Sequence, residues 1–185
     1  MPGDIKSVSN YEQDFSAWAL QQAATLRAAG ESVAKGARRR TDLPSIVRNL
    51  DWLNLAEEIE ALARKDRREL ASRIVTIIEH LVKLQHSVAR EPRAGWMETI
   101  GHARSELEDI LRDSPSLRRE IEGLIANKGH RAVQLAARSL VEHGEMTEAA
   151  AARLSAAYLV DQVIGEWWPE SPSATPKRNS SPPAT

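Results

Sequence analysis

The chain has 185 residues, which suits one domain, and its formal net charge is −1 with both signs interspersed, so its overall charge favours neither nucleic acid nor an anionic membrane as a partner. Cysteine is absent, which excludes disulfides, thiolate metal sites and cysteine nucleophiles and suits the reducing cytoplasm, the location we predict. No apolar run reaches the roughly 18 residues of a membrane helix, and the first residues lack a secretory signal's apolar core, so we expect no membrane association.

The first helix is predicted from a capping pattern near the start of the chain. Residues 1–8 are expected to form a flexible tail, and a single helical domain is predicted over residues 9–168. Ser9 and Glu12 have the spacing of a capping box, which marks a helix start. The amphipathic helix that follows is expected to end at Gly30.

A basic segment, residues 31–49, follows this helix and contains the run KGARRR. We interpret it as a linker with one helical turn begun at Asp42 and Pro44. The alternative is a contact for phosphate, with residues 35–48 as a weak nucleic-acid binder. We favour the linker, because the run has no interleaved aromatic residues. The alternative would depend on Arg38, Arg39 and Arg40.

Residues 51–89 are predicted to form one long helix that ends before Pro92. Its apolar residues recur at spacings of three and four in two seams, 52–62 and 70–88. The two seams are out of phase by one residue. The offset falls within residues 64–69, RKDRRE, where we expect the stripe to rotate or the helix to bend. An unbroken helix of this length would span roughly 55 Å, so it should protrude, kink or pack on a partner.

Further helices are predicted after the long one. Ser114 and Pro115 have the residue types of a helix start, and Gly144 should break the helix that follows. A short last helix is expected near residues 158–164, and a disordered tail rich in Pro and Ser over 169–185. The predicted fold is therefore all-α, a single-domain helical bundle built around the long helix.

The tryptophans are interpreted as core anchors rather than stacking platforms for nucleic acid. The chain has only one Phe and two Tyr, so we expect at least three tryptophans to be largely buried. The five are Trp18, Trp52, Trp96, Trp167 and Trp168.

Several stretches of the sequence are similar to one bacterial family. They are YEQDFSAW (11–18), LDWLNLAEEIEAL (50–62), RRELASRIVTIIEHLVKLQ (67–85), LRDSPSL (111–117) and YxxxQVIxEWWP (158–169). In this order they resemble the family called domain of unknown function 29, common in cyanobacteria and proteobacteria. The resemblance implies a small all-helical bacterial protein and brings no activity or site residue with it.

Acidic residues and histidines on the helices raise the question of a metal site. Helical bundles hold di-iron centres through Glu-x-x-His motifs, yet none of the five histidines has an acidic residue three positions earlier, and no His-x-x-x-His pair is present. Glu98 and His102 share a helix face that should meet water. The candidate ligands that stay open are Glu58, His80 and His102, with Glu57, Glu60 and His86 nearby in the sequence.

Three functional classes follow from these observations. We favour a non-catalytic helical interaction or structural module, because the helical seam is long and the sequence has no GxSxG, P-loop or GxGxxG motif. This hypothesis predicts a homodimer or a protein partner and no cofactor. The alternatives are a metal-dependent helical-bundle enzyme that uses carboxylate and histidine ligands, and a weak nucleic-acid binder through residues 35–48.

Overall fold

Helices account for most of the computed structural model, which describes residues 7–36, 49–155, 157–170 and 172. They are α1 (Ser7–Gln13), α2 (Phe15–Gly36), α4 (Trp52–His86), α5 (Arg93–Asp113), the 3₁₀ helix η1 (Pro115–Glu120), α6 (Ile121–Glu142), α7 (Glu148–Ala151) and α8 (Val160–Ile164). No strand occurs in these ranges, and the predicted all-α fold is confirmed. None of the helices in the described part combines the length and apolar character needed to cross a bilayer.

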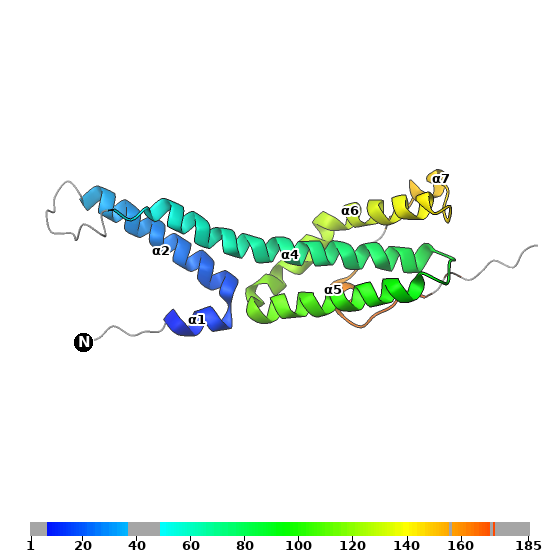
Figure 1. Cartoon of the computed structure of the whole chain (residues 1–185), viewed down its shortest axis with the longest axis horizontal. Coiled ribbons are helices and arrows are strands. Elements are labelled where there is room, and N and C mark those ends of the chain that lie inside the picture. Colours follow the sequence, from blue (N-terminus) through cyan, green and yellow to red (C-terminus); the bar gives the residue numbers. More distant parts are fainter. Residues whose placement is uncertain (1–6, 37–48, 156, 171, 173–185) are drawn as a thin grey trace, which may run out of the picture.

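Helix α4 organises the molecule, and the other long helices pack against different halves of it (Figure 1). At 35 residues it spans about 52 Å. Helix α2 lies along its first half and extends beyond the end of α5, whereas α5 and α6 flank its second half. We call α2 with residues 52–66 the arm, and residues 67–86 with α5, η1, α6 and α8 the body. Of the three alternatives predicted for the long helix, to protrude, to kink or to pack on a partner, the structure shows the first, because its first half extends beyond α5.

The buried seam of α4 is continuous, and the predicted offset within residues 64–69 was wrong. Leu55 and Leu62, which the prediction placed in the seam, are 40% and 46% exposed. The seam instead uses positions one residue further along, which include small alanines that a search for large apolar residues overlooks. Its buried members are Ala56, Ala63, Leu70, Ile74, Ile77, Leu81 and Leu84, and α4 runs unbroken through all of them.

The arm packs through small residues, which lets its two helices approach closely. A Cβ atom added at Gly30 would lie 2.6 Å from the Cβ of Trp52, a separation that no side chain tolerates without a shift. Gly30 therefore serves helix contact rather than helix termination. The prediction that the helix ends there was wrong, because α2 continues to Gly36 and residues 31–36 are helical rather than part of a linker.

Asp14 divides the first predicted helix into α1 and α2. One carboxylate oxygen accepts a hydrogen bond from the backbone N–H of Ala17 at 2.9 Å, which satisfies a free donor at the start of α2. The same carboxylate accepts from the N–H of Ser116 at 2.6 Å and from its hydroxyl at 2.9 Å. The break thus ties the beginning of α2 to η1, where the arm meets the body.

A second polar contact at this junction is buried. The Ser114 hydroxyl accepts from the N–H of Ser16 at 3.1 Å and donates to a carboxylate oxygen of Asp66 at 3.3 Å, and Ser114 is fully buried. Burial raises the pKa of Asp66 above its ordinary value of 3.8, and the hydrogen bond from Ser114 partly offsets that rise.

The body has an aliphatic core with tryptophans only at its edge. Trp18, Trp52 and Trp96 are partly buried, Trp167 and Trp168 are exposed, and Trp96 packs against the aliphatic cluster from outside. The large, fully buried side chains of the body are Leu and Ile, with Val82 and Val163. The tryptophans are therefore packing partners of the core rather than its centre.

Two predicted helix ends can be compared with the structure. Helix α4 ends at His86, three residues before the predicted end, because Ser87 caps it with an N–H bond to the Lys83 carbonyl at 2.8 Å. Gly144 has a φ of +70°, and the helix stops just before it, as predicted. The predicted turn at residues 42–44 and most of both predicted tails lie outside the described residues.

We expect Gly30→Ala to destabilise the protein, because the new methyl group would collide with Trp52. Overpacking costs about 1–3 kcal/mol, which exceeds the gain in helix propensity of about 1 kcal/mol. Urea unfolding measures the change. Gly123→Ala is the matched control, since that helical position is exposed and a Cβ there meets nothing within 4 Å. The control should gain stability, and a gain at both positions would contradict the close contact.

We expect Asp66→Asn to raise the free energy of unfolding at pH 7, because the neutral amide can accept the Ser114 hydroxyl without burial of a charge. The native carboxyl holds its proton more tightly than the unfolded one, so the penalty is complete above the native pKa and disappears as the pH falls below 3.8. The stability difference from the parent chain, measured by urea unfolding, should shrink on acidification. A difference that stays constant with pH would contradict this account.

Candidate functional site

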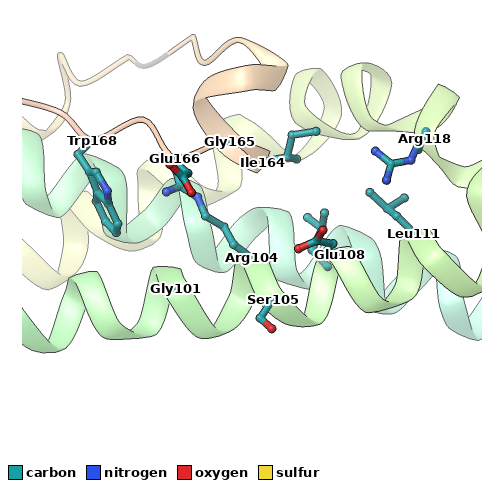
Figure 2. A pocket seen from close by; sticks show the side chains of 11 residues that line it. Gly101, Arg104, Ser105, Glu108, Leu111, Arg118, Ile164, Gly165, Glu166 and Trp168 are labelled. Carbon is teal, nitrogen blue, oxygen red and sulfur yellow. The ribbon is translucent and has the colours of Figure 1, made fainter.

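A broad hollow lies between α5 and the segment from α8 to Trp168 (Figure 2). Its volume is about 740 Å³. Helix α5 contributes Arg104 and Glu108, and the C-terminal segment contributes Glu166 and Trp168. Figure 2 shows the Arg104 side chain rising from α5 toward the C-terminal segment. The hollow exists because that segment returns across α5 after α8.

Arg104 fastens the C-terminal segment to α5. Its guanidinium donates to the carbonyl oxygens of Val163 at 3.0 Å, Gln162 at 2.9 Å and Trp167 at 2.9 Å. The guanidinium carbon also lies 4.9 Å from the ring centroid of Trp168, a cation–π contact. Burial lowers the pKa of Arg104, and the charge of Glu166 opposes that shift. The guanidinium of Arg104 nevertheless stays positively charged, because an arginine side chain is not deprotonated in proteins.

These contacts give the hollow a structural role. The Nε and Nη2 donors of Arg104 are directed at backbone carbonyls of the same chain, so these donors are engaged within the protein. Ser105, which lines the hollow, has no histidine or carboxylate within hydrogen-bond distance in the described part of the chain, so the pairing that activates a serine nucleophile is missing there. The arrangement can hold the C-terminal segment in place.

Sequence reasoning did not single out Arg104. The sequence predicted that the domain ends at residue 168, but nothing in the spacing of α5 linked that end to an arginine about sixty positions earlier. The available signal was an arginine on the edge of the apolar face of α5, next to the buried Ala103.

The structure does not bring the candidate metal ligands together. Glu58 lies exposed on the arm. On the same unbroken helix, His80 is 22 residues later, about 33 Å away, and its Nδ1 donates to the Thr76 carbonyl at 2.9 Å. His102 is on α5, 3.7 Å from Glu98. Among the residues that the structure describes, no group of three or more His, Asp or Glu side chains is placed to hold a metal ion.

The three residues near these candidates in the sequence, Glu57, Glu60 and His86, have environments that differ from one another. Glu60 pairs with Arg27 of α2 and with Arg64, and the hydrogen bond from Arg27 is the main cause that lowers its pKa. Glu57 is exposed, and burial lowers the pKa of His86. Glu60 therefore ties the two helices of the arm together.

The predicted nucleic-acid contact cannot be placed in the same way. Arg38, Arg39 and Arg40 lie outside the described residues, and so does almost all of the segment 35–48.

Comparisons with known proteins agree with the helical architecture. A family model described as domain of unknown function DUF29 matches residues 10–168. A crystal structure of an alpha-helical protein of unknown function from Rhodospirillum rubrum is similar, with a TM-score of 0.61 and 28% sequence identity, and the match covers 84% of this chain and 89% of that chain. A search of curated proteins finds no match.

We expect Arg104→Ala to release the C-terminal segment, because three carbonyls lose a charged donor and Trp168 loses its cation. The free energy of unfolding should fall by roughly 2–4 kcal/mol. Amide hydrogen exchange in Val160–Ile164 should accelerate more than exchange in α6. Arg112→Ala is the control, because Arg112 is exposed and its ion-pair partner among the described residues is Asp109 on its own helix. Equal protection of α8 in both variants would contradict the proposed role of Arg104.

Proposed function

Because the chain belongs to the DUF29 family, whose name assigns no reaction, we propose that it is a non-catalytic helical interaction module whose arm pairs with the arm of a second copy. The observation that carries this proposal is the pair of exposed leucines, Leu55 and Leu62, on one side of the arm. The lack of cysteine in the chain supports the reducing cytoplasm as its place of action.

Several leucines of the arm are exposed to solvent. Leu53 is 61% exposed, Leu62 46% and Leu55 40% on α4, and Leu20 is 50% exposed on α2. Single exposed leucines are ordinary on protein surfaces, whereas a group of them on one projecting element marks an interaction surface. The arm meets the body at only one end, so its flanks are open to a partner.

One stripe of the arm is suited to a second copy of the chain. Leu55, Glu58, Leu62 and Lys65 follow a 3-4-3 spacing and are all exposed, so they share one side of α4. In an antiparallel pair, a two-fold axis beside Leu62 places each Glu58 opposite the Lys65 of the other copy. Neither charged side chain has an ion-pair partner among the described residues, so both are free to pair across the interface.

The same stripe makes other registers less favourable. A parallel alignment would place Glu58 beside Glu58 and Lys65 beside Lys65, and such like-charge contacts cost free energy. The antiparallel alignment therefore combines apolar burial at Leu62 with charge complementarity on both sides of it. Of the two alternatives, the metal enzyme has no converging ligands among the described residues, and the residues of the nucleic-acid contact lie outside them.

The mass of the particle in solution tests this proposal. We expect light scattering on the full chain to give twice the chain mass at micromolar concentration, and Leu62→Glu to give the mass of one chain, because it buries a charge at the axis. Leu135→Glu is the matched control, since Leu135 is 39% exposed on α6, away from the arm. A monomeric parent chain would reject self-association.

Reversal of the two charges tests the register. Glu58→Lys and Lys65→Glu should each weaken the dimer, because each places like charges opposite each other. The double variant should recover the dimer, since the exchanged charges again face their opposites. Weakening that persists in the double variant would show that Glu58 and Lys65 do not meet across the axis.

A further inference from the structure

A second hollow lies in the body between α4 and α6, and its lining is strongly basic. Its volume is about 260 Å³. Helix α4 contributes Arg67, Arg68 and Ser72, and α6 contributes Lys128 and Arg131. No acidic residue lines it, although acids make up 26 of the 185 residues of the chain.

Most of these cations have no carboxylate partner. Arg67 pairs with Glu120 beside the hollow. Arg68 donates from Nε to the carbonyl of Arg64 at 3.2 Å, which fixes its position but leaves its charge uncompensated. In the part of the chain that the structure describes, Lys128 and Arg131 form no ion pair. Three uncompensated cations from two helices thus share one small hollow, and like charges at short range cost free energy unless an anion joins them.

The floor of the hollow is apolar. It is formed by Ala71 and Val75 of α4 and Leu124 of α6, and Leu124 is buried in the core. An apolar floor keeps water from one side of the hollow and lowers the local dielectric constant, which strengthens the attraction between an anion and the surrounding cations.

The pattern repeats on both helices. Arg68, Ser72 and Val75 follow a 4-3 spacing on α4, and Leu124, Lys128 and Arg131 follow the same spacing on α6. Two helix faces, each with basic and apolar positions, therefore oppose each other. This pairing was hidden in the sequence, where RKDRRE looked like an interruption of the helix and the cations of α6 lay about sixty residues away.

We propose that this hollow binds the phosphoryl group of a small phosphorylated molecule, a function separate from the pairing of the arms. Arg68 and Arg131 have the planar donors that match phosphate oxygens, Lys128 adds a compact positive charge, and Ser72 adds a hydroxyl donor. The hollow is smaller than the usual range for ligand sites, about 300–1,000 Å³. It therefore suits one phosphoryl or diphosphoryl group, with the rest of the ligand outside.

Calorimetry with inorganic pyrophosphate tests the site on the full chain. We expect saturable binding of one pyrophosphate per chain that weakens as salt screens the charges. The double variant Arg68→Gln/Arg131→Gln should bind at least about tenfold more weakly, since each lost charged hydrogen bond is worth that much. The control is Arg90→Gln/Arg119→Gln, which removes the same charge from two exposed arginines with no carboxylate partner in the described ranges.

The outcomes separate the possibilities. Binding that is lost in the first double variant and kept in the control supports the site, whereas equal affinities in both variants overturn it. Lys128→Gln gives an independent check, because it should also weaken binding while urea unfolding shows an intact fold. Light scattering on the first double variant should still show the dimer, because neither arginine belongs to the Leu55–Lys65 stripe.

A single-stranded oligonucleotide distinguishes the source of the phosphate. If the ligand is a small phosphorylated molecule, the oligonucleotide should compete with pyrophosphate only as well as its terminal phosphate alone would. Affinity that rises with the length of the oligonucleotide, and that falls in the first double variant, would overturn the small-molecule assignment in favour of a polynucleotide backbone.

Discussion

Helix α4 must bury one continuous stripe over a length that no other helix of the described residues can cover. It has 35 residues, against 22, 21 and 22 for α2, α5 and α6. The stripe therefore has two kinds of neighbour. Where only α2 lies beside it, the buried positions are Ala56 and Ala63; where α5 and α6 both lie beside it, they are large, from Leu70 to Leu84. Side-chain size along one helix thus determines where the arm ends and the body begins.

This division explains where the polar ties and the free surfaces occur. At the junction, Asp14 connects the start of α2 to η1, and Ser114 contacts both Ser16 and Asp66 of the arm. In the body, Arg104 holds the C-terminal segment. Both ties satisfy backbone groups that helix ends and turns leave without partners. The arm beyond the junction has one buried side only, because two helices cannot cover each other completely, and its leucines remain exposed.

The sequence predicted the fold class, the long helix and the break at Gly144 because these depend on periodicity and local conformation. It failed where the deciding contact was distant. Gly30 resembled a helix stop until Trp52 was seen against it, and Leu55 and Leu62 resembled core because the buried alanines beside them carry a weak hydrophobic signal. Arg104 and the basic hollow depend on residues about sixty positions apart, and no local pattern encodes such a meeting.

The central claim is that the exposed stripe of the arm meets its own copy beside Leu62. The chain contains no cysteine, so Leu62→Cys introduces a single thiol, and a two-fold axis at that position brings two thiols within the few ångströms that a disulfide requires. Mild oxidation followed by non-reducing electrophoresis should yield a covalent dimer from Leu62→Cys and none from Leu135→Cys. No cross-link at position 62, or equal cross-linking at both positions, would contradict the account.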